Sequence, residues 1–326
     1  MTLAPRELAQ QNLPASTRGW TNIHLQYTHG YGAVMNPVNQ SDVEGLPNYD
    51  IKDIPSTSTG GAPPITQPQI YYGQETSQYV VVDTKVNEVD YGTAAGTQTT
   101  TYSANRGINI GSLFRKLIFA WELGDTNLLI SGQITGNSRL LMRRNIRDRI
   151  SQIAPFLMLD NDPYLVIADG KLTWIQDAYT TTSNYPYSES HGSYNYIRNS
   201  VKVAVDAYTG DVTFYVVDSS DPIVRTYQAI FPKLFRSLDA MPASLRSHLR
   251  YPEDLFTAQA DMFRTYHMTD PQVFYTKGDL WETPKEGTGT TDQNVVPYYV
   301  IMRLPGETTE EFVLIRPFTP ANKPNA

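Results

Sequence analysis

Alternating apolar residues on both sides of a short turn constrain the fold of this chain more than any other feature. Residues 201–205 (VKVAV) place three valines on one face of an extended strand, and residues 212–216 (VTFYV) repeat the alternation. Residues 208–211 (YTGD) between them have the composition of a turn. A period of two on both sides of a turn predicts an antiparallel hairpin that buries one face.

Two further hairpins are predicted on the same grounds. Residues 165–175 form one, because Asp169-Gly170 supplies the positive φ that a tight turn requires. Residues 298–318 form the other, with a turn at 305–307. Three antiparallel hairpins without a repeated strand-helix-strand order argue against a parallel sheet.

The first hundred residues have weaker patterns. Residues 1–53 contain proline, glycine and asparagine at short intervals, which predicts irregular structure with one short helix near residues 6–11. Residues 55–68 (PSTSTGGAPPITQP) predict a mobile loop. Two strands are expected at 69–72 and 79–83, and a further exposed loop at 92–101.

Helical patterns separate the hairpins. Ser112 can cap a helix whose apolar residues recur at the spacing of one face, and Gly124 can end it. That face contains Leu113, Leu117, Ala120 and Trp121. Helices are also expected at 221–235 and 243–268, the latter interrupted at Tyr251-Pro252.

Residues 138–153 predict another helix, which Pro155 ends because proline lacks the amide donor. Its inward face would contain Met142, Ile146, Ile150 and Ile153. Its arginines, expected mainly outward, would face solvent or anionic lipid headgroups; they stand at 139, 143, 144, 147 and 149.

These elements together predict an α+β fold, in which a mixed, mainly antiparallel set of hairpins packs against helices. We expect an amino-terminal lobe at residues 1–157 and a hairpin-rich lobe at 158–326, or one continuous domain. The length of 326 residues is sufficient for a substantial core without disulfides.

Composition excludes several classes of function. The chain has no cysteine, which rules out disulfides, thiolate metal sites and cysteine nucleophiles within it. Its formal net charge of -7 argues against nucleic acid as a partner. The apolar run at 113–123 is broken by charged residues and is shorter than the roughly 20 residues that span a bilayer.

Long strings spread over the chain carry a family resemblance. They include residues 24–34 (HLQYTHGYGAV), 162–170 (DPYLVIADG), 196–208 (YIRNSVKVAVDAY) and 248–256 (HLRYPEDLF). On these strings the chain resembles uncharacterised protein family 0182, a family of large multi-pass membrane proteins.

The resemblance implies that transmembrane helices outside this chain anchor the protein in the plasma membrane. This chain would be the first part of a soluble domain on the extracytoplasmic (extracellular or periplasmic) side. Its partners would be other envelope or membrane components. The family carries no established activity, so the resemblance assigns no catalytic residue, and we expect no cofactor.

The densest aromatic group stands between two of the predicted strands. Flat tyrosine faces beside polar side chains can bind a glycan or an extended peptide, although aromatic pairs also stabilise sheets. The candidate binding residues are Tyr185, Tyr187, Tyr194 and Tyr196, with Asn184 and Asn195.

Histidines offer a weaker alternative. His24 and His29 could bind a metal with Asp42 or Glu44, and His267 stands close to Asp270. The competing interpretation places the first two in a turn and His267 at a helix carboxyl end. Because no compact motif combines a nucleophile with a base, we expect a non-enzymatic interaction or scaffold domain. The alternatives are an envelope hydrolase or metal-dependent enzyme, and a glycan- or peptide-binding module.

Overall fold

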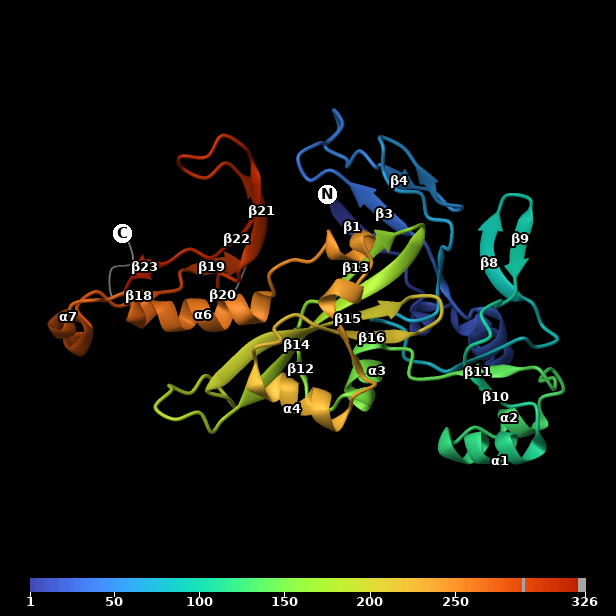
Figure 1. Ribbon diagram of the computed structural model, residues 1–326. Coiled ribbons are helices and arrows are strands. Elements are labelled where there is room, and N and C mark those ends of the chain that lie inside the picture. The colour runs from blue at the N-terminus through green and yellow to red at the C-terminus, as the bar shows by residue number, and fades with distance from the viewer. Residues whose placement is uncertain (289–290, 322–326) are drawn as a thin grey trace.

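A six-stranded sheet forms the centre of the molecule (Figure 1). The computed structural model describes residues 1–288 and 291–321. The strands of the central sheet are β12 (Met158–Leu159), β13 (Tyr164–Ala168), β14 (Lys171–Thr182), β15 (Tyr196–Asp206), β16 (Val212–Val216) and β17 (Phe235–Ser237). Their order is β12-β14-β15-β16-β17, β13 also pairs with β14, and only the pairing of β16 with β17 is parallel within this sheet.

The predicted hairpins are confirmed. Asp169 and Gly170 both have positive φ, at 52° and 77°, in the turn between β13 and β14. β15 pairs with β16 so that Val203 lies opposite Phe214. The third hairpin joins β21 (Tyr298–Met302) to β22 (Glu311–Ile315).

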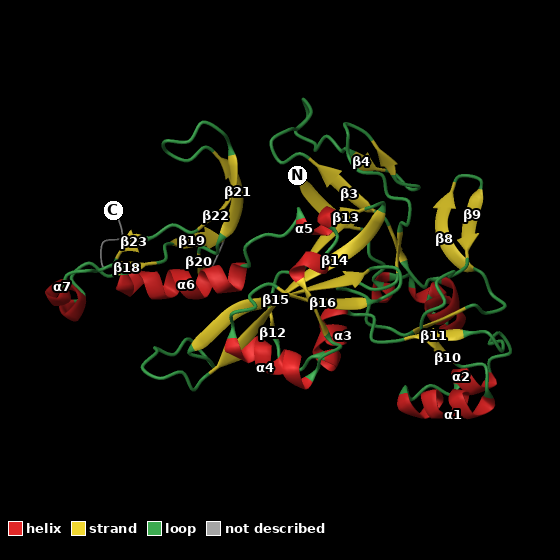
Figure 2. Cartoon of the chain, viewed as in Figure 1, coloured by secondary structure: helices red, strands yellow, loops and turns green. Residues whose placement is uncertain are grey.

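Helices cover both faces of the central sheet (Figure 2). One face packs against α3 (Ile146–Ile153) and α4 (Pro222–Ile230), in a cluster that includes Trp174 and Val203. The other packs against the short helices η4 (Leu238–Ala240) and α5 (Ala243–Arg246). The cluster that packs against α3 and α4 contains residues from both sides of position 158. The division of the chain into two lobes stays a prediction.

The amino-terminal segment contains more regular structure than predicted. β1 (Thr2–Pro5), β3 (Ala33–Asn36), β4 (Ile51–Lys52) and β5 (Thr57–Ser58) form a four-stranded sheet, and β2 (Gly30–Tyr31) pairs with β6 (Gln69–Ile70). The short helix expected near residues 6–11 is wrong: 3₁₀ turns occur at η1 (Gln10–Asn12) and η2 (Ala15–Thr17), and a π-helix at η3 (Asn22–Gln26). These strands pair with distant partners, which local pattern does not reveal.

Two other predictions are corrected. Residues 92–101 are mostly strand, because β8 (Glu88–Thr93) and β9 (Gly96–Thr100) form an exposed hairpin. Residues 138–153 are not one helix: β11 (Arg139–Leu141) pairs with β7 (Val80–Val82) and β10 (Ile108–Asn109), and α3 begins only after Asn145. The Asn145 side chain accepts hydrogen bonds from the amides of Arg147 and Asp148, which fixes the start of α3.

Arg144 lies in the interior, contrary to the expected outward position of the arginines. Its guanidinium donates to the carbonyl oxygens of Tyr71 (2.6 Å), Gln78 (3.1 Å) and Thr28. Ile153, expected inward, is instead exposed. Arg144 precedes the start of α3, so the helical spacing assumed for it does not apply. Ile146 and Ile150 are buried as predicted, whereas Ile153 is the last residue of the helix.

Helix α1 (Leu113–Glu122) is confirmed with its cap, since Ser112 Oγ accepts from the Arg115 amide at 3.3 Å. Leu113, Leu117 and Trp121 of its predicted apolar face point into solvent, however, and only Ala120 is buried. The helix packs beside α2 (Asn127–Ile130) on a second, smaller core.

The last part of the chain, from α6 onward, lies to one side of the sheet (Figure 1). It consists of α6 (Glu253–Tyr266), α7 (Pro271–Thr276), the β21–β22 hairpin and the paired strands β18 (Trp281–Glu282) with β23 (Thr319–Pro320) and β19 (Lys285–Thr288) with β20 (Thr291–Asn294). α6 begins after Pro252, as predicted. Among the described residues, no helix is both long and apolar enough to cross a bilayer.

Candidate functional site

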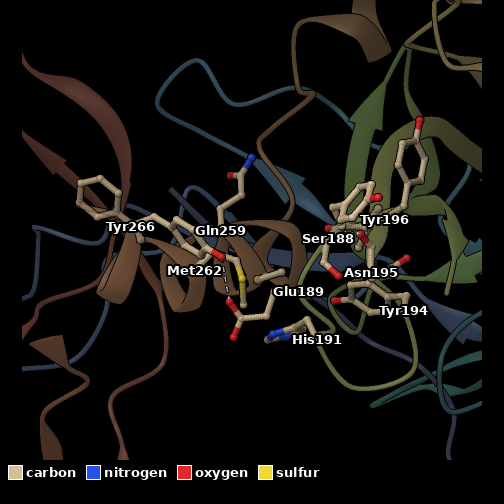
Figure 3. Close-up of a pocket in the computed structure, with 13 residues that line it drawn as sticks. Ser188, Glu189, His191, Tyr194, Asn195, Tyr196, Gln259, Met262 and Tyr266 are labelled. Carbon is tan, nitrogen blue, oxygen red and sulfur yellow. Dashed lines mark hydrogen bonds between the residues drawn. The ribbon is translucent and has the colours of Figure 1, made fainter. Parts of the chain in front are cut away.

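An open cleft of about 480 Å³ lies between the β14–β15 loop and helix α6 (Figure 3). The loop, residues 183–195, contributes one wall, and the start of β15 continues it. The opposite wall, on α6, contains Ala258, Gln259, Met262, Phe263 and Tyr266, and its apolar part (Ala258, Met262 and Phe263) is called the floor of the cleft below. A concave, mostly apolar surface of this size with a few polar groups is typical of ligand sites.

Asn195 shapes the loop. Its Oδ1 accepts from the Tyr185 amide at 2.9 Å, and its Nδ2 donates to the Tyr185 carbonyl oxygen at 2.8 Å. Ser188 Oγ donates to the Asn195 carbonyl oxygen at 2.8 Å. This two-sided bonding of one side-chain amide braces the loop from within.

Tyr196 anchors the sheet side of the cleft. Its ring stacks on Tyr185 with 5.4 Å between centroids, and its hydroxyl donates to Asp221 Oδ1 at 2.7 Å. Burial and the neighbouring Asp221 carboxylate raise the pKa of Tyr196 to about 12. The hydroxyl therefore stays neutral at physiological pH and keeps donating to Asp221.

The loop and α6 also touch across the cleft. Tyr266 on α6 donates from its hydroxyl to Glu189 Oε2 at 3.1 Å. His191 Nε2 lies 4.0 Å from Asp261 Oδ2, and Asp261 accepts from Arg316 at 3.0 Å. The polar groups of these two contacts, together with the apolar floor, allow a ligand to be held by van der Waals contact and a few hydrogen bonds.

The comparisons decide the family. The model of the uncharacterised protein family (UPF0182) matches residues 1–326. The chain belongs to UPF0182. A UPF0182 protein of Pelotomaculum thermopropionicum is 51% identical over 324 residues, covering 99% of this chain and 35% of the relative. A UPF0182 protein of Methanospirillum hungatei is 50% identical and covers 99% of this chain and 37% of the relative. One of Sulfurovum sp. is 48% identical and covers 100% of this chain and 36% of the relative.

The UPF0182 chain thus spans little more than a third of the length of these curated relatives. No solved structure matches it.

In this UPF0182 chain the three candidate histidines lie apart, each in its own packing environment. His24 Nδ1 bonds the Tyr79 carbonyl oxygen at 2.8 Å and its ring stacks on Tyr79. His29 is buried, with Nδ1 at 2.9 Å from the Gly30 carbonyl oxygen. Burial lowers the pKa of both histidines, which favours neutral rings.

His267 stacks on Trp281 at 3.7 Å between centroids and bonds the Phe263 carbonyl oxygen. Asp42 accepts from the amides of Glu44 and Leu46 in a local turn, so it supports the loop. Across residues 1–288 and 291–321, no group of three or more His, Cys, Asp or Glu side chains is placed to hold a metal ion.

Only part of the predicted tyrosine group of this UPF0182 chain lines the cleft. Tyr187, Tyr194, Tyr196 and Asn195 line it, with Tyr187 fully exposed at the rim. Tyr185 stacks behind Tyr196, and Asn184 is outside the lining. The wall on α6 was missed, as were Glu189 and His191. The apolar spacing of Met262, Phe263 and Tyr266 was a usable signal, but it indicates a buried stripe equally well.

Proposed function

We propose that this UPF0182 chain is an extracytoplasmic interaction domain of a multi-pass plasma-membrane protein. It binds an extended peptide segment of another envelope or membrane protein in the cleft between residues 183–195 and α6. The observation that carries the proposal is the composition of the cleft: a largely apolar floor with Met262 and Phe263, and tyrosines at its edges.

Peptide fits this floor better than glycan. Methionine and aromatic side chains adapt to apolar peptide side chains, while a saccharide needs many directed hydrogen bonds along its length. Ser188 and Asn195, which could supply them, bond the loop itself. The rival hydrolase or metal-dependent enzyme finds no support, because His24, His29 and His267 do not converge.

Peptide binding is expected to depend on Met262. Selection of a displayed random peptide library on the immobilised chain should enrich sequences with large apolar residues. Met262→Glu puts a charge on the apolar floor and should weaken the selected peptides at least about tenfold by calorimetry. Tyr275→Ala, which removes an exposed aromatic on α7, should leave binding unchanged. Failure to enrich any peptide, or equal binding by Met262→Glu, would refute the cleft as a peptide site. Retention on purified cell-wall glycan that Met262→Glu abolishes would assign it to saccharide instead.

The extracytoplasmic position has a direct test, since the chain has no cysteine. Tyr187→Cys in the full-length protein places a thiol at a fully exposed position. A membrane-impermeant maleimide added to spheroplasts, in which any outer membrane is opened and the cytoplasmic membrane is intact, is expected to label it, with the protein lacking this substitution as the control. Labelling that appears only after lysis would place these residues in the cytosol and contradict the proposal.

A further inference from the structure

Helix α6 is joined to the central sheet mainly by polar contacts. The three clusters of buried apolar side chains contain no described residue after Leu249. At the first turn of α6, the Asp254 amide donates to Asp160 Oδ2 at 3.1 Å, and Asp254 Oδ2 accepts from the Asn161 amide at 2.9 Å. The strength of such contacts depends on the charges around them, and therefore on pH.

Two carboxyl groups face each other where α6 begins. Glu253, the first residue of α6, is hydrogen-bonded to Asp162, which lies between β12 and β13. Ionised carboxylates are acceptors only, so this pair can bond only when one member holds a proton. The Arg250 guanidinium pairs with Asp162 from the segment before the helix. The start of α6 thus contacts the sheet side partly through a bond that requires a proton.

A second titratable contact joins the middle of α6 to residues 183–195. His191 Nε2 lies 4.0 Å from Asp261 Oδ2. Histidine is the side chain that ordinarily changes charge between about pH 5 and 8, and its charged ring attracts a carboxylate. Asp261 also accepts from Arg316 at 3.0 Å, which weakens this attraction without removing it. Both contacts therefore strengthen when protons bind.

The groups around Glu253 favour its protonated form. Burial, and then the Asp162 carboxylate, raise the pKa of Glu253 to about 7 against the opposing charge of Arg250. The other charged and titratable groups at this position are Asp160, Asp254, Arg147 of α3 and Tyr299 of β21. Behind them, the buried Asp177 of β14 is paired with Lys202 of β15. His191 has Glu189 and Tyr194 beside it on its own loop.

The direction of the pH dependence follows from the raised pKa of Glu253. The proton favours the arrangement in which α6 contacts the segment between β12 and β13. This contribution is complete below about pH 4.5, and it is lost as the pH rises through about 7. Burial and Asp160 raise the pKa of Asp254 as well, which acts in the same direction.

We propose that α6 is a pH-gated wall of the cleft: protons hold it against the sheet side, and rising pH releases its first turn and widens the cleft. Loss of the shared proton leaves Glu253 and Asp162 as like charges, and deprotonation of His191 removes its attraction to Asp261. The helix then turns about residues 247–252, which connect it to α5. The width changes whatever the cleft binds, so it is measured as a distance and not as peptide binding.

Two spin labels measure this width, because the chain has no cysteine of its own. Asn184→Cys places one label on the loop, outside the lining of the cleft. Tyr275→Cys places the other on α7, beyond the far end of α6 (Figure 1). Between about pH 5.5 and about pH 8.5, the fraction of long distances in pulsed electron paramagnetic resonance should rise about tenfold. Identical distance distributions at the two pH values would overturn the proposal.

Uncharged variants of the labelled chain identify the groups responsible. Glu253→Gln keeps a donor to Asp162 at every pH, and Asp162→Asn removes the facing charge, so each should reduce the rise to less than about twofold. His191→Gln should remove a smaller part of it. Glu282→Gln is the matched control and should respond like the unaltered chain, because this exposed carboxylate on β18 makes no hydrogen bond or ion pair with the described residues. A full response in both Glu253→Gln and Asp162→Asn would also contradict the proposal.

Discussion

Replacing Arg144 with methionine is expected to lower the free energy of unfolding by about 3–5 kcal/mol. Arg144 is only 1% exposed, and its guanidinium donates to the carbonyl oxygens of Tyr71 and Thr28 in the interior and to that of Gln78 nearer the surface. Methionine keeps the packing of the aliphatic stem but leaves these acceptors without a donor. Unpaired buried carbonyls cost about 1–3 kcal/mol each.

The guanidinium of Arg144 is charged as well as hydrogen-bonded. Burial lowers its pKa to about 10, which still leaves the guanidinium protonated at neutral pH, in the field of Glu88 and Glu7. Urea unfolding followed by tryptophan fluorescence measures the effect. Arg143→Met is the matched control, because the neighbouring arginine is exposed and its loss should change stability by less than about 0.5 kcal/mol. Equal urea midpoints for the Arg144→Met and Arg143→Met variants would show that the buried hydrogen bonds of Arg144 contribute little to stability.

Asp221→Ala is expected to cost about 3 kcal/mol of unfolding free energy. The carboxylate accepts from Thr180 Oγ1 at 2.5 Å, from Ser200 Oγ at 2.7 Å and from the Tyr196 hydroxyl at 2.7 Å. It also caps α4 through the amides of Ile223 and Val224. One substitution therefore removes a helix cap and three charge-assisted bonds that join α4, β14 and β15.

The same variant links stability to the cleft. Because Tyr196 loses its acceptor, the wall of the cleft should loosen, and peptide binding should weaken even under conditions where the variant remains folded. Asp218→Ala serves as the control, since that carboxylate bonds only the nearby Ser220 among the hydrogen bonds of the described residues. A loss of stability at Asp218 as large as that at Asp221 would contradict this account.

The stability contributed by Asp221 should depend on pH. Burial alone would raise the pKa of Asp221, but the hydrogen bonds from Thr180, Ser200 and Tyr196 outweigh it and the pKa is lowered. A lowered folded pKa gives stability that is present above the unfolded pKa and lost as pH falls through the folded value. The difference in unfolding free energy between the natural chain and Asp221→Asn should therefore be constant above about pH 5 and narrow below it. A constant difference down to acid unfolding would refute the role of ionised Asp221.

The candidate site was partly visible in the sequence. The tyrosine group marked the loop that lines the cleft, because aromatic residues close together in sequence stay close in space. The cleft itself requires α6, whose Met262 and Tyr266 are far from the loop along the chain. Glu189 and His191 gain their roles only through Tyr266 and Asp261, which α6 carries.

Local rules account for the hairpins and the helix starts. Asp169 and Gly170 adopt the positive φ that a two-residue hairpin turn requires. Ser112 and Asp221 cap helices by accepting from amides only a few residues away. Long-range packing determined the rest: the pairing of β1 with β3, the burial of Arg144 and the exposure of the apolar face of α1. An amphipathic pattern states that one helical face is apolar, but whether that face meets the core, a ligand or a membrane depends on which surfaces the folded chain brings against it.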